Sequence, residues 1–219
     1  MKILAIGLIA LALGGITRPL VPATRLETGY LFSQTQQYLS TLVNPKKPLP
    51  KSAPVIFNPL LDEAGNEITP SDMNFSIIVP KIGINAAVIP AVNPTNPKEY
   101  DEALLKGVAH ASTSFFPNEN GVVYLFSHST NYEWFVKDLN AVFYLMKNLE
   151  PGDIAILVYK GTRYIYSITE KRVVSPKEIS YMAPIEGKRM LILETCWPPG
   201  STTQRLLVLA NLIDIAYNK

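Results

Sequence analysis

Cys196 has the sequence surroundings of a nucleophile. An apolar run, 190–195, leads directly into this cysteine, and a loop rich in Pro, Gly, Ser and Thr follows it. A thiolate attacks acyl carbons, and it needs a neighbouring group that takes up and returns a proton. A lone cysteine is more often a small buried core residue, so the interpretation depends on its neighbours.

Arg205 is the residue that brings a permanent positive charge back to this region. It opens a second apolar run, nine residues after Cys196. If the two runs pair as an antiparallel hairpin, Cys196 and Arg205 lie at the same end of the sheet. The guanidinium can then donate several hydrogen bonds to an oxyanion that forms near the sulfur.

His128 is the candidate proton carrier, because it ends another apolar run within the segment 121–130. A surface histidine in a polar turn is the alternative, but a Cys–His pair is a known arrangement for nucleophilic catalysis. With unperturbed pKa values of about 8.5 for Cys and 6.5 for His, both groups are charged together in about 1% of molecules at pH 7. We therefore expect modest turnover.

Short runs rich in β-branched and aromatic residues supply the strands that must position these side chains. Pro-Lys, Pro-Gly-Asp and Lys-Gly-Thr-Arg turn signals bound them. The runs are residues 75–79, 84–89, 122–127, 154–159, 164–174, 190–195 and 206–215.

Two segments have helical character, residues 97–105 and residues 133–149, with Asn96 as N-cap of the first and Pro151 closing the second. Many strands and few helices indicate one mainly β domain over residues 75–219. We predict a closed antiparallel β-barrel of about eight strands with a few short helices.

The segment before this domain reads as a membrane anchor followed by a spacer. Residues 1–23 contain Lys2 and an unbroken apolar run, 3–16, as in a signal peptide or a short signal anchor. We favour the uncleaved anchor, because Pro22 makes the nearest candidate cleavage site a poor match. Residues 24–74 then predict a stalk and a Pro-rich spacer. The domain is therefore expected at the cell membrane, outside the cytoplasm.

Composition excludes several classes of function. The formal net charge is +2, and the basic residues are scattered rather than gathered beside stacking aromatics, so we expect no nucleic acid partner. One cysteine and two histidines allow neither a disulfide framework nor a cysteine-rich zinc site. Glu99, Asp101 and Glu102 read as a solvated helix face rather than a calcium site. We expect no metal and no cofactor.

The segment around the cysteine resembles the active-site strand of the sortase family. Leu193, Glu194, Thr195 and Cys196 are similar to the end of the family's usual Thr-Leu-x-Thr-Cys, with Ile192 in place of the first Thr. Further segments match in the same order along the chain, and Ser127 replaces the usual Gly before the histidine. The further matching segments are residues 78–88, 107–117, 122–128 and 149–153. The similarity therefore covers about 75 to 215.

The resemblance implies a transpeptidase that cleaves a C-terminal sorting signal similar to Leu-Pro-x-Thr-Gly. Cys196 would attack the carbonyl after Thr and form a thioacyl-enzyme, His128 would shuttle the proton, and Arg205 would stabilise the oxyanion. A primary amine from a cell-wall precursor or a pilin subunit would resolve the intermediate and anchor a surface protein. His110 matches a family position that is structural, so it stays outside the catalytic set.

Four residues are candidates for contact with the sorting signal. In sortases the connection before the cysteine strand shapes the substrate groove, and here it is about 175–188, with Ile179 and Met182 among its apolar residues. Thr195 and Trp197 flank the nucleophile. Trp197 either walls the groove or caps the barrel, and both alternatives stand.

Two rival functions stand beside the sortase interpretation, one non-catalytic and one with the same Cys–His chemistry. A non-catalytic, membrane-anchored binding module on a sortase-like barrel is the alternative that Ser127 and Ile192 favour. An L,D-transpeptidase would need a Ser-His-Gly motif close to the cysteine, whereas His128 lies far upstream of Cys196. The sortase subclass stays open, although the spacer contains no Asp-Pro-aromatic motif of the kind found in the pilin-polymerising type.

Overall fold

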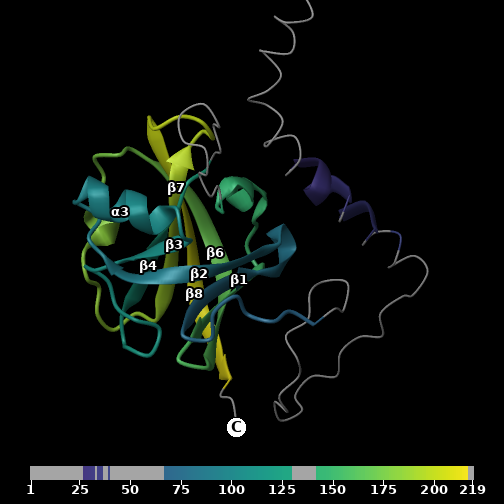
Figure 1. Cartoon of the computed structure of the whole chain (residues 1–219), viewed down its shortest axis with the longest axis horizontal. Helices are drawn as coiled ribbons and strands as arrows, with labels where there is room; N and C mark the ends of the chain where they lie inside the picture. The colour runs from purple at the N-terminus through teal and green to yellow at the C-terminus, as the bar shows by residue number, and fades with distance from the viewer. Residues whose placement is uncertain (1–26, 33, 37–38, 40–66, 130–141, 217–219) are drawn as a thin grey trace, which may run out of the picture.

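The computed structural model describes residues 27–32, 34–36, 39, 67–129 and 142–216 (Figure 1). The expected anchor, 1–23, and much of the expected stalk and spacer, 24–74, lie outside the described residues. The boundaries between these parts stay predictions. None of the helices in the described ranges is long and apolar enough to cross a membrane.

The described residues of the domain form a closed barrel of eight strands, which confirms the mainly β prediction. The strands follow one another around the barrel in the order β1, β2, β3, β4, β7, β8, β6, β5. Their bounds are β1 Phe75–Val79, β2 Ile84–Val92, β3 Val108–Ala111, β4 Val122–Phe126, β5 Ile154–Tyr159, β6 Thr162–Val174, β7 Met190–Trp197 and β8 Gln204–Ala216.

The barrel is not antiparallel throughout, which corrects one part of the prediction. β2 pairs with β3 in parallel, and β4 pairs with β7 in parallel. Parallel neighbours need a crossover connection, and the helix α3, Pro97–Leu104, supplies it between β2 and β3. In the second pair, β5 and β6 lie between the partners in the sequence. Such long-range pairing leaves no local signal for a sequence-based prediction.

The first predicted helix is present, and the described part of the second, 142–149, contains a 3-10 helix instead of an α-helix. Asn96 caps α3, with its side-chain oxygen accepting from the Glu99 amide at 3.5 Å. Of the predicted helix 133–149, the described part contains only a 3-10 helix, η3, over Tyr144–Asn148, with no side-chain cap at Phe143. Two further 3-10 helices are η2, Pro80–Ile82, and η4, Ser180–Met182.

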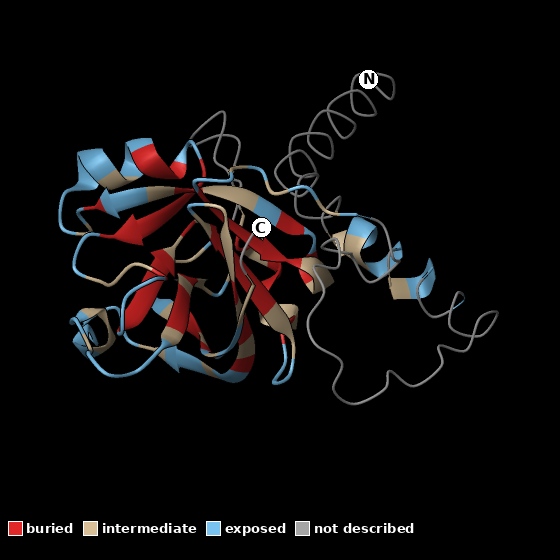
Figure 2. Cartoon of the chain, turned by 90° about the horizontal axis from the view of Figure 1, so that it is seen from below, coloured by how far each residue is buried: buried red, intermediate tan, exposed pale blue. Residues whose placement is uncertain are grey.

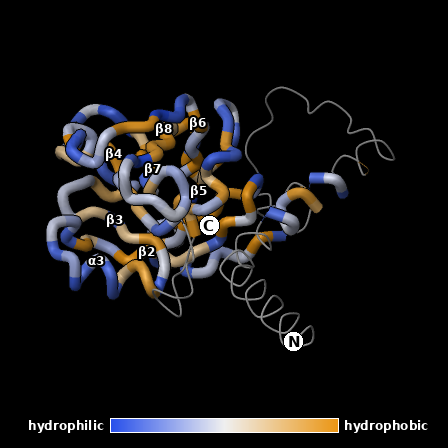
Figure 3. The backbone as a smooth tube through the Cα atoms, turned by 90° about the horizontal axis from the view of Figure 1, so that it is seen from above, coloured by the Kyte–Doolittle hydropathy of each residue, from blue (hydrophilic) through white to orange (hydrophobic). Residues whose placement is uncertain are grey.

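Buried residues are frequent along the strands of the barrel (Figure 2), and they form one large interior cluster and smaller separate clusters. The interior cluster includes Ile77, Leu125, Leu193 and Val208. Strand residues alternate between the two sides. Figure 3 shows hydrophobic colours along barrel strands and hydrophilic colours over α3 and several connections.

A second cluster, called here the outer-face cluster, covers the outside of β4, β7 and β8. Its buried members include Tyr124, Ile192 and Leu207. Tyr181 and Met182, from the connection between β6 and β7, pack against it. This connection therefore covers part of the outer surface of β7, the strand that carries Cys196.

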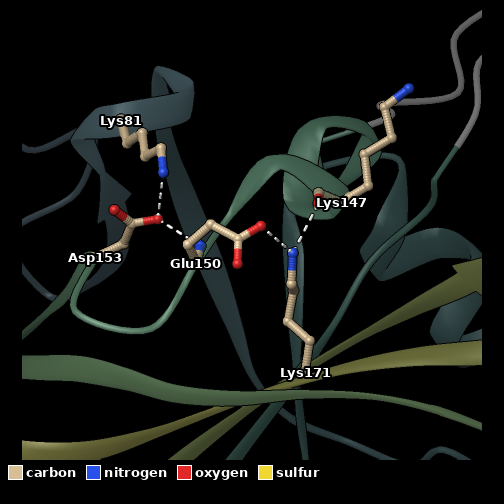
Figure 4. Close-up of polar contacts among 5 residues, drawn as sticks. All are labelled: Lys81, Lys147, Glu150, Asp153 and Lys171. Atoms are coloured by element: carbon tan, nitrogen blue, oxygen red, sulfur yellow. Dashed lines mark hydrogen bonds and ion pairs between the residues drawn. The ribbon is translucent and has the colours of Figure 1, made fainter.

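Polar contacts tie β6 to the turn before β5 and to η3 (Figure 4). Lys171 Nζ donates to the backbone oxygen of Lys147 at 3.0 Å and to Glu150 Oε1 at 2.9 Å. Lys81 Nζ lies 2.8 Å from Asp153 Oδ2, which also accepts from the Glu150 amide. The network therefore joins parts of the barrel that are distant in sequence.

Candidate active site

Cys196 and Arg205 lie directly opposite each other in the antiparallel pair β7–β8. The loop between them, which carries the Pro, Gly, Ser and Thr residues, closes this end of the hairpin. Directly paired residues point to the same side of a sheet. The hairpin geometry predicted from the nine-residue spacing is therefore confirmed, and it puts thiol and guanidinium on one face.

His128 reaches the same end of the barrel through the parallel pair β4–β7. The last registered pair is Phe126 with Glu194. His128 and Cys196 each lie two residues beyond this pair. If the same register continues, His128 lies beside Cys196. The imidazole, the thiol and the guanidinium therefore come from three adjacent chain segments at one rim of the barrel.

Backbone and side-chain hydrogen bonds extend this register past the end of β4. The Ser127 amide donates to the Glu194 carbonyl at 3.2 Å, and Thr195 Oγ1 donates to the Ser127 carbonyl at 2.8 Å. Ser127 Oγ reaches the Gly107 carbonyl at 3.5 Å. The hydroxyl at the position where the family usually has Gly is thus accommodated inside the fold, without occupying the thiol's face.

Arg205 is held by three contacts. Its Nε lies 3.0 Å from Glu194 Oε1, and its Nη1 donates to the carbonyls of Thr202 and Gln204, each at 3.0 Å. Glu194 shares the outer face with Cys196, because the two residues are two positions apart on one strand. Carboxylate, thiol and guanidinium therefore form one cluster of ionisable groups.

Burial favours the neutral forms of the two reacting groups. It raises the pKa of the Cys196 thiol, an effect that Arg205 opposes and Glu194 reinforces. Burial also lowers the pKa of His128, and the negative charge of Asp101 partly opposes this. At neutral pH the prevailing state is thus a thiol beside a neutral imidazole, and thiolate with imidazolium is a minor state.

The four predicted substrate residues do not share one surface. Met182 packs against the outer-face cluster, and Ile179, just before η4, is 62% exposed. Thr195 is buried, with its hydroxyl turned to Ser127. Trp197 is half-buried and packs against the interior cluster, as a cap of the barrel would.

His110 lies inside the fold, away from the rim that holds Cys196. Its ring is fully buried and stacks on Phe116 at 4.5 Å between centroids. Nδ1 accepts from the Ala91 amide at 3.2 Å, so Nε2 carries the proton that it donates to the Phe115 carbonyl at 3.0 Å. These contacts give His110 a structural role, as expected.

The ion pair between Glu194 and Arg205 is a feature of the site that was not predicted from the sequence. Its signal was present in the sequence, because alternation along a strand puts residues 194 and 196 on the same face. A carboxylate within a strand is usually a solvated side chain, so the alternation alone gave no reason to single it out.

This chain is similar in structure to several solved sortases. Sortase C-1 from Actinomyces oris is 21% identical, with a TM-score of 0.55, and the match covers 66% of this chain and 76% of that one. Sortase C from Clostridium perfringens SM101 is 26% identical, with a TM-score of 0.51, covering 67% of this chain and 73% of that one. These likenesses establish a sortase-like fold.

The sequence comparisons establish the family. A sortase domain model matches residues 77–213, and Sortase D from Bacillus subtilis (strain 168) is 30% identical over 133 residues. This chain belongs to the sortase family, whose members are cysteine transpeptidases. The match to Sortase D spans 59% of this chain and 59% of that relative's length. The similar proteins carry the class letters A, C and D, so they assign no subclass.

Proposed function

We propose that this protein is a transpeptidase that cleaves a C-terminal sorting signal similar to Leu-Pro-x-Thr-Gly, with Cys196 as its nucleophile. The observation that carries the proposal is the placement of Cys196 directly opposite Arg205, with the chain running from β4 into His128 alongside. A buried core cysteine would need neither partner, whereas covalent catalysis needs both a proton carrier and a stabilised oxyanion.

In the first half-reaction the Cys196 thiolate attacks the carbonyl carbon of the signal's Thr, in the peptide bond that joins Thr to the next residue. The tetrahedral intermediate carries its negative charge on the former carbonyl oxygen, and Arg205 donates hydrogen bonds to it. His128, as imidazolium, protonates the departing amine, and the C–N bond breaks. A thioester between Cys196 and the Thr acyl group remains.

In the second half-reaction a primary amine attacks the thioester. His128, now neutral, takes a proton from the incoming amine, and the C–S bond breaks to release the Cys196 thiolate. The product is a new amide bond, and the imidazolium–thiolate pair is restored. Each group therefore returns to its starting state without a cofactor.

The surface beside Cys196 suits an apolar signal peptide. The outer-face cluster is an apolar surface, and the connection that carries Met182 and Tyr181 packs against it. The exposed side chain of Ile179 is available at the edge of that connection. In the proposed complex the Leu-Pro part of the signal contacts Met182 and Ile179, while its Thr carbonyl reaches Cys196.

The proposed setting is the outer side of the cell membrane. Residues 1–23 would act as an uncleaved anchor, and residues 24–74 would hold the barrel away from the bilayer. The partners would be surface proteins with a C-terminal sorting signal, and the amine acceptor would come from a cell-wall precursor or a pilin subunit.

Peptide processing tests the proposal directly. The full chain in detergent micelles is incubated with a panel of sorting-signal peptides and a primary amine, and products are identified by mass spectrometry. We expect a cleaved, amine-linked product and a Cys196 thioester adduct with the wild type. Cys196→Ala is expected to give neither, while its thermal unfolding stays close to that of the wild type.

Two outcomes of this experiment would contradict the proposal. If the wild type leaves every peptide intact but binds some of them, the non-catalytic binding module is the better description. If Cys196→Ala still forms the amine-linked product, the nucleophile is a different group.

A further inference from the structure

Glu194 carries a largely buried carboxylate that the proposed chemistry does not use. Its side chain is 13% exposed and lies on β7, two residues before Cys196 and on the same face. Glu and Asp side chains at such depth are usually retained only with a charged or hydrogen-bonded partner. Here the partner is Arg205, at 3.0 Å between Oε1 and Nε.

The cations around Glu194 come from β8 and β6. Arg205 lies on β8, and Arg172 lies on β6, opposite Leu207, which is itself opposite Glu194. Arg172 is bound by Glu170, through Nε at 2.5 Å and Nη2 at 2.7 Å. Among the residues that the structure describes, Arg205 is therefore the cation in contact with Glu194.

Titratable groups also approach from η4 and from the end of β4. Tyr181 of η4 packs on the outer-face cluster, and its pKa is raised by burial, lowered by the charge of Arg205 and raised by Glu178. His128 follows β4, under the influence of Asp101 in α3. In the described part of the chain, neither ring forms a hydrogen bond with Glu194.

We propose that Glu194 is a positioning residue, which binds the Arg205 guanidinium and keeps the Cys196 thiol protonated in the substrate-free enzyme. The inference rests on the proposed function, because it takes Cys196 as the nucleophile and Arg205 as the oxyanion partner. It adds a residue that restrains both of them before a substrate arrives.

The electrostatics of the cluster support this role. An ionised Glu194 repels a thiolate on the same face, and it offsets the positive charge of Arg205 that would favour the thiolate. Burial raises the pKa of Glu194 to about 7, although Arg205 opposes the rise. Above that pH the carboxylate is mostly ionised, and it then resists ionisation of the thiol.

Glu194→Gln separates the charge of this side chain from its shape. The amide oxygen can still accept a hydrogen bond from Arg205 Nε, but the side chain carries no charge. Because Cys196 is the chain's one cysteine, iodoacetamide alkylation of the full chain reports the ionisation of this thiol alone. Rates measured from about pH 6 to about pH 10 give the pH midpoint of thiol ionisation.

We expect the midpoint of the Glu194→Gln variant to fall below that of the wild type. The alkylation rate near pH 8 is expected to rise about three- to tenfold. Glu170→Gln is the matched control, since Glu170 is also bound by an arginine but is solvent-exposed. Its midpoint is expected to equal that of the wild type.

Glu194→Leu removes both the charge and the hydrogen bond. We expect its midpoint to fall as in Glu194→Gln, while its kcat/KM for peptide cleavage falls about tenfold below that of Glu194→Gln, because Arg205 is no longer held. Should the leucine variant fail to fold, the glutamine variant decides alone.

An unchanged or raised midpoint in Glu194→Gln would overturn the inference, whatever the peptide assay shows. A failure of the proposed function has a different signature: the wild type then processes no peptide, while the alkylation comparison can still be made.

Discussion

At the scale of single residues, burial sets the protonation states of the reacting pair. The same partial burial that raises the pKa of Cys196 lowers that of His128, so each group resists its charged form. The reactive combination of thiolate and imidazolium is consequently a minor population at any pH. Its fraction is greatest between the two pKa values and falls outside them.

These directions predict a broad, bell-shaped pH dependence of kcat/KM for peptide cleavage. Below the pKa of His128, which burial lowers, further acid removes thiolate without adding imidazolium. Above the pKa of Cys196, which burial raises, further base removes imidazolium without adding thiolate. Initial rates with a fluorogenic sorting-signal peptide measure the profile. A narrow optimum below pH 6.5 would contradict the assignment of these two groups.

At the scale of secondary-structure elements, the start of β3 is packed unusually closely against β2. A Cβ atom on Gly107 would lie 2.3 Å from the carbonyl oxygen of Ala87, which is backbone and cannot rotate away. The Gly107 carbonyl also accepts from Ser127, the residue before His128. Glycine at this position therefore allows β2, β3 and the end of β4 to meet.

Gly107→Ala is expected to destabilise the barrel, because the two strands must separate to admit the methyl group. Overpacking of this kind costs roughly 1–3 kcal/mol in the free energy of unfolding. Urea unfolding followed by tryptophan fluorescence measures the loss. Gly29→Ala is the control, since no atom lies within 4 Å of its added Cβ. Equal stability of the two variants would show that the close approach is relaxed at little cost.

At the scale of the whole molecule, the network around Lys171 links regions that are distant in sequence. Lys171 on β6 reaches η3 and the turn before β5, and Lys81 reaches the same turn from η2. The side chain of Lys171 is 23% exposed, and the side chain of its partner Glu150 is mostly exposed. Solvent therefore screens the ion pair, and the hydrogen bond to the Lys147 carbonyl is the stronger part.

Lys171→Met is expected to lower the free energy of unfolding by about 1 kcal/mol, chiefly through the loss of that hydrogen bond. The methionine keeps the aliphatic length of the side chain, so lost packing contributes little. Lys188→Met is the matched control, at an exposed position without an ion pair among the described residues. Thermal and urea unfolding measure both variants. If they lose equal stability, the network contributes nothing specific.

Alternating apolar runs were sufficient to locate most of the barrel. β1 and β5 occupy the predicted ranges, and the other predicted strands differ by a few residues at their ends. β3 was not predicted, because its four residues, with His110 among them, are too short to show a period. The prediction of an antiparallel barrel was wrong for two strand pairs, β2–β3 and β4–β7, because these parallel pairs join strands that no short turn connects.

Cys196 shows which features the sequence determines by itself. Its strand, the loop after it and the opposition of Arg205 follow from local spacing, because a hairpin is closed by its own short loop. The position of His128 next to the β7 strand and the burial of the Glu194–Arg205 ion pair were decided by the tertiary structure. The first depends on β4 pairing with β7 across the intervening β5 and β6, and the second on how deeply the sheet buries one carboxylate. The first is set by the closure of the barrel, which brings distant segments together only once the chain has folded, whereas the second joins residues of one hairpin and owes its burial to the packing around that hairpin.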